Sequence, residues 1–201
     1  MPRDIRARYH GGCEVVDEIE ELAIARAASL FGAEYVNVQP VSGTAAASAV
    51  YAAFAQPGDP VLSLRLDHGG HQTHGSRANF SGRWFTTIRY AVGEVDELVD
   101  YDQIRDLALL HRPRLLVAGS ATYSRLFHFP TLRQIADEAE CILWVDAAHL
   151  RVGRRWGGAE SGAPCRRRDD GHAQGAACPR GGRGCWARTV DRAALQKAVV
   201  P

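Results

Sequence analysis

Between residues 34 and 145, short apolar runs alternate with segments whose apolar residues recur at helical spacing. The runs have the length of strands and are largely apolar at consecutive positions, as in sheets covered by helices on both faces. We expect strands at 34–38, 61–64, 84–90, 114–118 and 142–145, and helices at 14–31, 45–54, 101–110 and 132–138. Strands that alternate with helices predict an α/β domain with a mostly parallel sheet.

The composition of the chain changes near residue 150. Up to His149, apolar and charged residues are interleaved as in an ordinary globular domain, whereas residues 151–188 are rich in arginine and glycine and have no hydrophobic period. With 201 residues, of which 46% are hydrophobic, the chain is long enough for one sizeable core. Its only lysine is Lys197.

Charge, hydropathy and cysteine content exclude several classes of protein. The net charge of +1 points to no particular partner, no apolar run is long enough to span a bilayer, and the N-terminus lacks an apolar signal core. The five cysteines are odd in number and show no C-x-x-C spacing, so we expect reduced thiols rather than a disulfide framework. We expect a cytoplasmic protein with no membrane partner.

Ser42, Gly43 and Thr44 lie between an expected strand and an expected helix. This arrangement directs free backbone N–H groups and hydroxyls at an anion. Gly43 lets the backbone approach a ligand closely, and Thr44 could serve both as the N-cap and as a phosphate donor. A plain helix cap is the alternative interpretation.

The segment 68–75 reads His-Gly-Gly-His-Gln-Thr-His-Gly and is too rich in glycine for a stable helix. Its three histidines allow three interpretations. They could form a metal site, because imidazoles are common ligands. The segment could be a solvated loop, or its glycines could admit an aromatic cofactor on which one imidazole lies flat.

Asp146 directly follows the apolar run 142–145. It therefore lies at the carboxyl end of an expected strand, which is the edge where open α/β sheets bind ligands. A carboxylate at this edge can keep a pyridinium nitrogen protonated and so make the ring an electron sink. A capping aspartate is the alternative.

Five motifs occur in the order known from one family. They are RYHGGCE at 8–14, FGAEYVNVQP at 31–40, the loop 68–75, NFSG at 79–82 and VDAAH at 145–149. Together they resemble serine hydroxymethyltransferase over residues 8–150. The resemblance implies a fold-type-I pyridoxal-phosphate (PLP) enzyme whose large domain, a three-layer α/β/α structure, is incomplete here. Such an enzyme is a homodimer or larger and moves a one-carbon unit between serine and tetrahydrofolate, leaving glycine.

The resemblance also assigns roles by position. It implies that the turn 42–44 holds the PLP phosphate and that His71 stacks on the pyridine ring. Asp146 would bind the ring nitrogen, and His149 would lie near the phenolic oxygen. His71, Asp146 and His149 are thus the expected catalytic residues, and no metal site is expected.

The chain departs from the family pattern at several positions. His10 replaces the second tyrosine of the family's Tyr-Tyr-Gly-Gly motif. Val41 replaces a histidine that precedes the phosphate-binding turn in the family. Gln72 replaces a leucine that faces the folate, and Ala121 replaces a serine near the cofactor. The family's N-terminal segment, with a catalytic glutamate, and its C-terminal domain, with the substrate-binding arginine, are not in the sequence. We therefore expect a fragment truncated at both ends.

The family's PLP lysine, which forms the Schiff base, is expected near Gln174, but residues 173–175 are Ala-Gln-Gly. The genetic code permits the codons GGC-CAC-GCA-CAA-GGC for residues 171–175, and these codons, read one nucleotide later, encode Ala-Thr-His-Lys. The original frame resumes at the family motif Pro-Arg-Gly-Gly, residues 179–182. We interpret residues 151–178 as bracketed by two compensating frameshifts, between a large-domain portion at 1–150 and a return to family sequence at 179–201.

The segment 151–178 has other interpretations if its sequence is genuine. Residues 166–168, together with 180–184 beyond the segment, resemble an Arg/Gly-rich nucleic-acid-binding tail. Cys165, His172, Cys178 and Cys185 lie at spacings that match no standard zinc site. We expect neither, and so no nucleic-acid partner. Because burying the charged run 166–170 unpaired is prohibitive, we also predict that residues 151–178 do not pack as a regular part of the sheet.

Three functions follow from these observations. The first is a serine hydroxymethyltransferase-like enzyme that is inactive as written, because it lacks the PLP lysine. The second is a folate-independent aldolase or transaldolase of β-hydroxy amino acids, which Gln72, His10 and Ala121 favour. The third is a nonenzymatic fragment with a basic nucleic-acid-binding tail.

Overall fold

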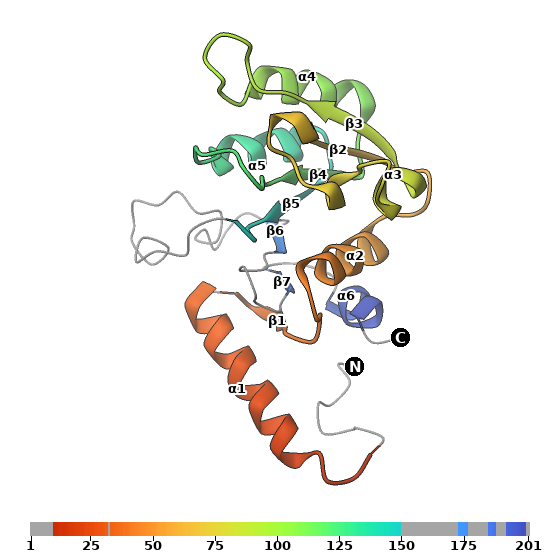
Figure 1. The fold of residues 1–201 in the computed structure, drawn as a ribbon, viewed down its shortest axis with the longest axis vertical. Helices are drawn as coiled ribbons and strands as arrows, with labels where there is room; N and C mark the ends of the chain where they lie inside the picture. The colour runs from red at the N-terminus through yellow and green to blue at the C-terminus, as the bar shows by residue number, and fades with distance from the viewer. Residues whose placement is uncertain (1–9, 32, 150–172, 177–184, 188–191, 200–201) are drawn as a thin grey trace.

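The computed structural model describes residues 10–31, 33–149, 173–176, 185–187 and 192–199. Its centre is a five-stranded sheet in the order β3-β2-β4-β5-β6, in which every pairing is parallel (Figure 1). The strands are β2 (Pro60–Leu64), β3 (Thr86–Tyr90), β4 (Leu115–Ala118), β5 (Ile142–Asp146) and β6 (Ala173–Ala176). The predicted α/β fold with a mostly parallel sheet is confirmed.

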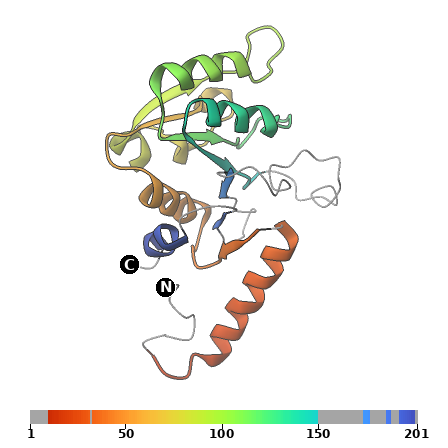
Figure 2. The same cartoon turned by 180° about the vertical axis from the view of Figure 1, so that it is seen from behind.

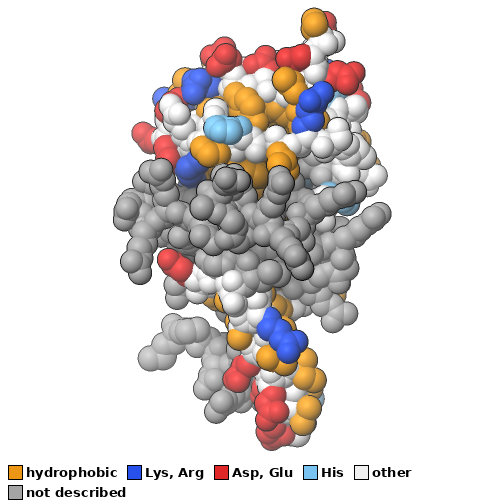
Figure 3. All heavy atoms as spheres, turned by 90° about the vertical axis from the view of Figure 1, so that its left-hand side faces the viewer, with side chains coloured by type: hydrophobic (Ala, Val, Ile, Leu, Met, Phe, Trp, Pro, Cys, Tyr) orange, Lys and Arg blue, Asp and Glu red, His pale blue; other side chains and the backbone are white. Residues whose placement is uncertain are grey.

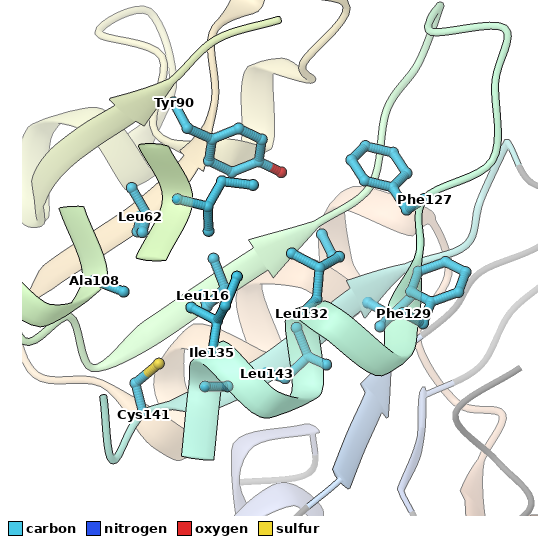
Figure 4. Close-up of a cluster of buried hydrophobic side chains, with 14 of the residues drawn as sticks. Leu62, Tyr90, Ala108, Leu116, Phe127, Phe129, Leu132, Ile135, Cys141 and Leu143 are labelled. Atoms are coloured by element: carbon cyan, nitrogen blue, oxygen red, sulfur yellow. The ribbon is translucent and has the colours of Figure 1, made fainter. Parts of the chain in front are cut away.

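One face of this sheet packs against α4 (Tyr101–His111) and α5 (Phe129–Glu138). Leu116 of β4 and Leu143 of β5 meet Ile135 of α5 in a fully buried cluster (Figure 4). Both helices place their apolar residues at helical spacing toward the strands, so burial of this face drives their docking.

The opposite face packs against α2 (Gly43–Phe54), and α6 (Arg192–Val199) packs against α2. Because side chains alternate along a strand, Leu115 in β4 points to this second core, away from Leu116. There it joins Tyr51 of α2 and Leu195 of α6. Helices thus cover both faces of the sheet, which gives the three predicted layers (Figure 2).

At one end of the molecule, β1 (Tyr35–Asn37) pairs antiparallel with β7 (Cys185–Ala187). The preceding helix, α1 (Glu14–Phe31), extends away from the sheet as an arm (Figures 1 and 2). Apolar side chains in its outer half are exposed beside acidic ones (Figure 3). None of the helices in the described part of the chain is long and apolar enough to cross a membrane.

The helix and strand predictions differ from the structure mainly at element ends. The strand predicted at 84–90 starts too early, because Trp84 is the last residue of the short helix α3 (Phe80–Trp84). The Asn79 side chain caps α3 by accepting a hydrogen bond from the Ser81 N–H at 3.1 Å. The local sequence Asn-Phe-Ser-Gly therefore forms a helical turn before the chain extends.

The prediction that residues 151–178 stay out of the sheet is wrong for β6. Its four residues pair in parallel with β5, from Leu143 opposite Ala173 to Asp146 opposite Ala176. Strand pairing uses backbone groups alone, and the segment Ala-Gln-Gly-Ala supplies them without a charged side chain. The charged run 166–170, on which the prediction rested, lies outside the described residues.

Candidate active site

Several segments meet at the carboxyl edge of the parallel sheet. Asp146 is the last residue of β5, and loops 65–75 and 119–128 follow β2 and β4. A short connection joins the end of α2 to the start of β2, so the N-terminus of α2 lies toward this edge. The two loops are joined, because the Ala121 N–H donates to the Gly69 carbonyl at 2.9 Å. Open α/β sheets bind their ligands at this edge.

Ser42, and not Thr44, is the N-cap of α2, which corrects the prediction. Ser42 Oγ accepts from the Ala45 N–H at 3.1 Å, whereas Thr44 lies within the first turn. Ser42, Gly43 and Thr44 are exposed, and the first turn carries no acidic side chain. An open helix N-terminus attracts anions through its free N–H groups and its dipole, so this turn can hold a phosphate.

The histidine loop forms two short 3₁₀ turns, Leu66–His68 and Gln72–His74, and no longer helix. It packs directly against the end of β2. A Cβ atom on Gly70 would lie 2.4 Å from the Leu64 carbonyl oxygen, a backbone atom that cannot move aside. The loop is therefore an ordered part of the edge and not a freely solvated segment.

The three histidines of the loop have different partners. His68 Nδ1 accepts from the Val92 N–H at 3.1 Å, and His71 Nδ1 accepts from the Thr73 N–H at 3.2 Å. His74 instead reaches Asp146. Within the described residues, no group of three or more His, Cys, Asp or Glu side chains could hold a metal ion. The metal interpretation thus has no ligand set in this part of the chain.

Two of the predicted site residues, His71 and His149, lie near each other, with ring centroids 6.2 Å apart. Burial lowers the pKa of His71, and nearby imidazoles lower it further, while Asp146 acts in the opposite direction. The lowered pKa keeps His71 uncharged at neutral pH. A neutral imidazole at this edge can lie flat on an aromatic ligand.

Asp146 contacts a residue that the sequence analysis missed. His74 Nε2 lies 2.9 Å from Asp146 Oδ2, and the His74 side chain is only 1% exposed. The Ala148 N–H donates to Oδ1 at 3.0 Å. Burial alone would raise the pKa of Asp146, but the hydrogen bond and charge interaction with His74, aided by Ala148, outweigh it and lower the pKa. The carboxylate is therefore ionised at neutral pH, and 18% of its side-chain surface stays accessible.

The Asp146 carboxylate determines which His74 nitrogen donates the hydrogen bond between them. The ionised Asp146 can only accept, so Nε2 carries the proton. Nδ1 is buried and makes no hydrogen bond with any described residue. His74 thus donates to Asp146 through Nε2. Its ring packs edge-on against Trp144, with centroids 5.6 Å apart.

No local sequence signal joins His74 to Asp146, which is 72 residues further along the chain. The available signal is topological, because the carboxyl ends of two parallel strands in one sheet lie at the same edge. That argument brings the loop after β2 to the end of β5. It does not select which of the three histidines faces the carboxylate.

Replacing His74 with phenylalanine is expected to lower the free energy of unfolding at pH 7 by about 2 kcal/mol, because Asp146 loses a hydrogen bond donor while the ring volume is kept. Chemical denaturation measures the change. A double-mutant cycle with Asp146→Ala, which removes the acceptor, separates the pairwise interaction from packing. If the two substitutions are additive, the direct interaction is refuted.

Comparison with known proteins agrees with this geometry. The family model for serine hydroxymethyltransferase matches residues 5–153. The chain is 54% identical over 142 residues to serine hydroxymethyltransferase 1 of Pseudomonas fluorescens (strain Pf0-1), which covers 71% of the chain and 34% of the relative. It is 53% identical over 143 residues to the serine hydroxymethyltransferase of Teredinibacter turnerae (strain ATCC 39867 / T7901), with 71% and 34% covered.

A third relative is the serine hydroxymethyltransferase of Synechococcus sp. (strain JA-3-3Ab), 52% identical over 143 residues, with 71% of the chain and 33% of the relative covered. The chain thus spans about a third of the length of the curated relatives that it matches. Its sheet, with helices on both faces, has the architecture of a fold-type-I PLP enzyme. The match over most of the chain and the level of identity establish that this protein belongs to the serine hydroxymethyltransferase family.

Proposed function

We propose that the chain carries the PLP-binding part of an enzyme that moves a one-carbon unit between serine and tetrahydrofolate, leaving glycine. The observation that carries the proposal is the ionised Asp146 carboxylate, held by His74 at the carboxyl edge of the sheet. Such a carboxylate fits the protonated ring nitrogen of PLP, and the exposed start of α2 fits its phosphate. Bound PLP supplies an electron sink for negative charge at the α-carbon of an amino acid.

Each predicted site residue has a task in this proposal. The turn 42–44 binds the phosphate through backbone N–H groups and hydroxyls. His71 would cover one face of the ring, Asp146 would accept a hydrogen bond from the protonated ring nitrogen, and His149 would lie on the side of the phenolic oxygen. His74, the residue missed in the sequence, keeps the Asp146 carboxylate oriented and ionised.

We further propose that the chain is inactive as written, because it lacks the lysine that holds PLP covalently. The expected position, Gln174, lies in β6 and pairs with Trp144 of β5, two residues before Asp146. Lys197, in contrast, is exposed on α6. Two compensating frameshifts around residues 151–178 account for the missing lysine, and resequencing codons 150–179 tests this directly.

The contacts of α6 support grouping residues 179–201 with the large-domain portion 1–150. Leu195 is buried in the core beneath α2. Gln196 Oε1 accepts hydrogen bonds from Asn37 Nδ2 at 3.1 Å and from the Tyr35 hydroxyl, both in β1. We therefore propose that residues 151–178 are an altered stretch within one domain.

A folate-independent aldolase or transaldolase of β-hydroxy amino acids is the second candidate. Gln72 favours it, because this polar side chain is exposed at the position where the resemblance places a leucine against folate. The nucleic-acid-binding alternative rests on residues 166–168 and 180–184, which lie outside the described residues.

We propose a homodimer as the working assembly. Val15, Val16, Ile19 and Leu22 lie on the outer half of α1 and are between 48% and 66% exposed. A second copy of the chain would cover these apolar side chains. We also propose a cytoplasmic location, because the described cysteines, Cys13 and Cys141, are free thiols that suit a reducing compartment.

Restoring the reading frame over codons 151–178, and supplying the missing termini from a relative, is expected to give an enzyme that cleaves serine in a tetrahydrofolate-dependent manner. Glycine formation is measured with and without the folate, with Asp146→Asn as the inactive control. Glycine formation at the same rate with and without folate would favour the aldolase. An enzyme that binds no PLP would overturn the proposed function.

A further inference from the structure

We propose that Arg89 is a positioning residue, whose guanidinium clamps the turn ending at His74 and thereby holds the imidazole against Asp146. The inference rests on the proposed function, in which Asp146 must keep its charge and orientation. Arg89 belongs to β3, which is separated from β5 by the two strands β2 and β4. It touches neither Asp146 nor the expected cofactor residues in any described hydrogen bond.

The strand register places the clamp under the loop. β2 and β3 pair so that Ser63 lies opposite Arg89. Arg89 Nη1 donates to Ser63 Oγ at 3.1 Å and to the His74 carbonyl at 2.9 Å, and Nη2 donates to the Gly75 carbonyl. The Ser63 hydroxyl donates to the same His74 carbonyl at 2.7 Å. Two successive carbonyls of the loop are therefore held by one guanidinium.

The peptide between His74 and Gly75 is fixed from its other side as well. The Gly75 N–H donates to Ser81 Oγ at 2.9 Å. Gly75 has a φ of +100°, and a Cβ atom there would lie 2.3 Å from Thr87 Cγ2. The backbone at His74 thus has little freedom, and this fixes the position from which its side chain reaches Asp146.

Within the described residues, Arg89 forms no ion pair, and its guanidinium donates only to Ser63, His74 and Gly75. Arg65, Arg105 and Arg133 each lie within 3.2 Å of a carboxylate oxygen. Arg89 is half-buried, and burial lowers its pKa, yet its hydrogen-bond partners are neutral oxygens. A guanidinium remains charged in proteins, and the carbonyls that end a helical turn carry partial negative charge. The described hydrogen bonds of the half-buried cation all go to Ser63 and to the two carbonyls of the turn that it positions.

The test follows the His74 Nε2 proton by ¹⁵N-edited NMR on the full chain, without PLP. Hydrogen exchange of this proton is expected to become about tenfold faster in Arg89→Ala, because the turn loses charge-assisted hydrogen bonds. Arg89→Lys should recover part of the protection, since an ammonium can donate to one carbonyl. Arg114→Ala is the matched control, because Arg114 Nε donates to the Phe54 carbonyl at 2.7 Å, away from the loop.

Exchange of the Leu116 amide, in the central strand β4, reports global opening and is measured in the same samples. Faster exchange at His74 with unchanged exchange at Leu116 supports the proposal. Equal exchange at His74 in the parent chain and in Arg89→Ala overturns it. If Arg89→Ala does not fold, Arg89→Lys decides, and exchange as slow as in the parent refutes a role for the bidentate clamp. Because no PLP is present, failure of the restored enzyme to bind PLP would refute the proposed function and leave this result standing.

Discussion

Replacing Asp146 with asparagine in the restored enzyme is expected to lower the rate of serine cleavage about a hundredfold or more, in the range found when an electrostatic contact to a reacting group is removed. The amide can still accept a hydrogen bond from His74, so the shape of the site is retained. It carries no negative charge, however, and so cannot stabilise a protonated ring nitrogen. Single-turnover rates and the absorbance of bound PLP measure the loss.

Asp137→Asn is the matched control for this substitution. Asp137 is an exposed carboxylate that pairs with Arg133 on α5, away from the edge of the sheet. Its replacement should leave the rate unchanged. An Asp146→Asn enzyme that binds PLP and keeps full activity would remove Asp146 from the site and, with it, the central assignment of the proposal.

The pH dependence of stability gives an independent check on Asp146. Its pKa is lowered in the folded state, so its contribution to stability is complete above the ordinary value of about 3.9. The contribution is lost as the pH falls through the lower folded-state pKa, where the native carboxylate becomes protonated. Denaturation curves of the parent and of Asp146→Asn should therefore differ at pH 7 and converge in strong acid.

The chain as written is expected to form no stoichiometric lysine adduct when it is incubated with PLP and reduced with borohydride, and to turn over no serine. Lys197 is its only lysine, and it lies exposed on α6, which packs against α2 and not beside β5. Mass spectrometry of tryptic peptides detects any adduct. The frame-restored enzyme should gain both the adduct and the activity.

Lys197→Arg in the written chain controls for random modification of an exposed amine. Trace labelling that disappears with Lys197→Arg, without serine turnover, agrees with the prediction. A stoichiometric adduct at Lys197 together with turnover would show that PLP chemistry here does not need the lysine expected near Gln174. The frameshift interpretation would then lose its functional basis.

The sequence by itself determined the alternation of strands and helices, the turn at the start of α2, and the position of Asp146 at the end of a strand. These features are local, because hydrophobic periodicity, capping residues and strand length are set by neighbours along the chain. The errors at Trp84 and Thr44 are also local and concern single residues at element ends, where competing hydrogen bonds decide the boundary.

Only the tertiary structure decided which residues share the site. The pairing of β6 with β5, the choice of His74 among three histidines, and the support from Arg89 all join segments that are far apart in the sequence. Each depends on strand order and register, which bring the ends of β2 and β5 to one edge and set Ser63 beside Arg89. Periodicity reports which face of an element is buried, but not which distant element covers it, so these contacts could be found only once the sheet was assembled.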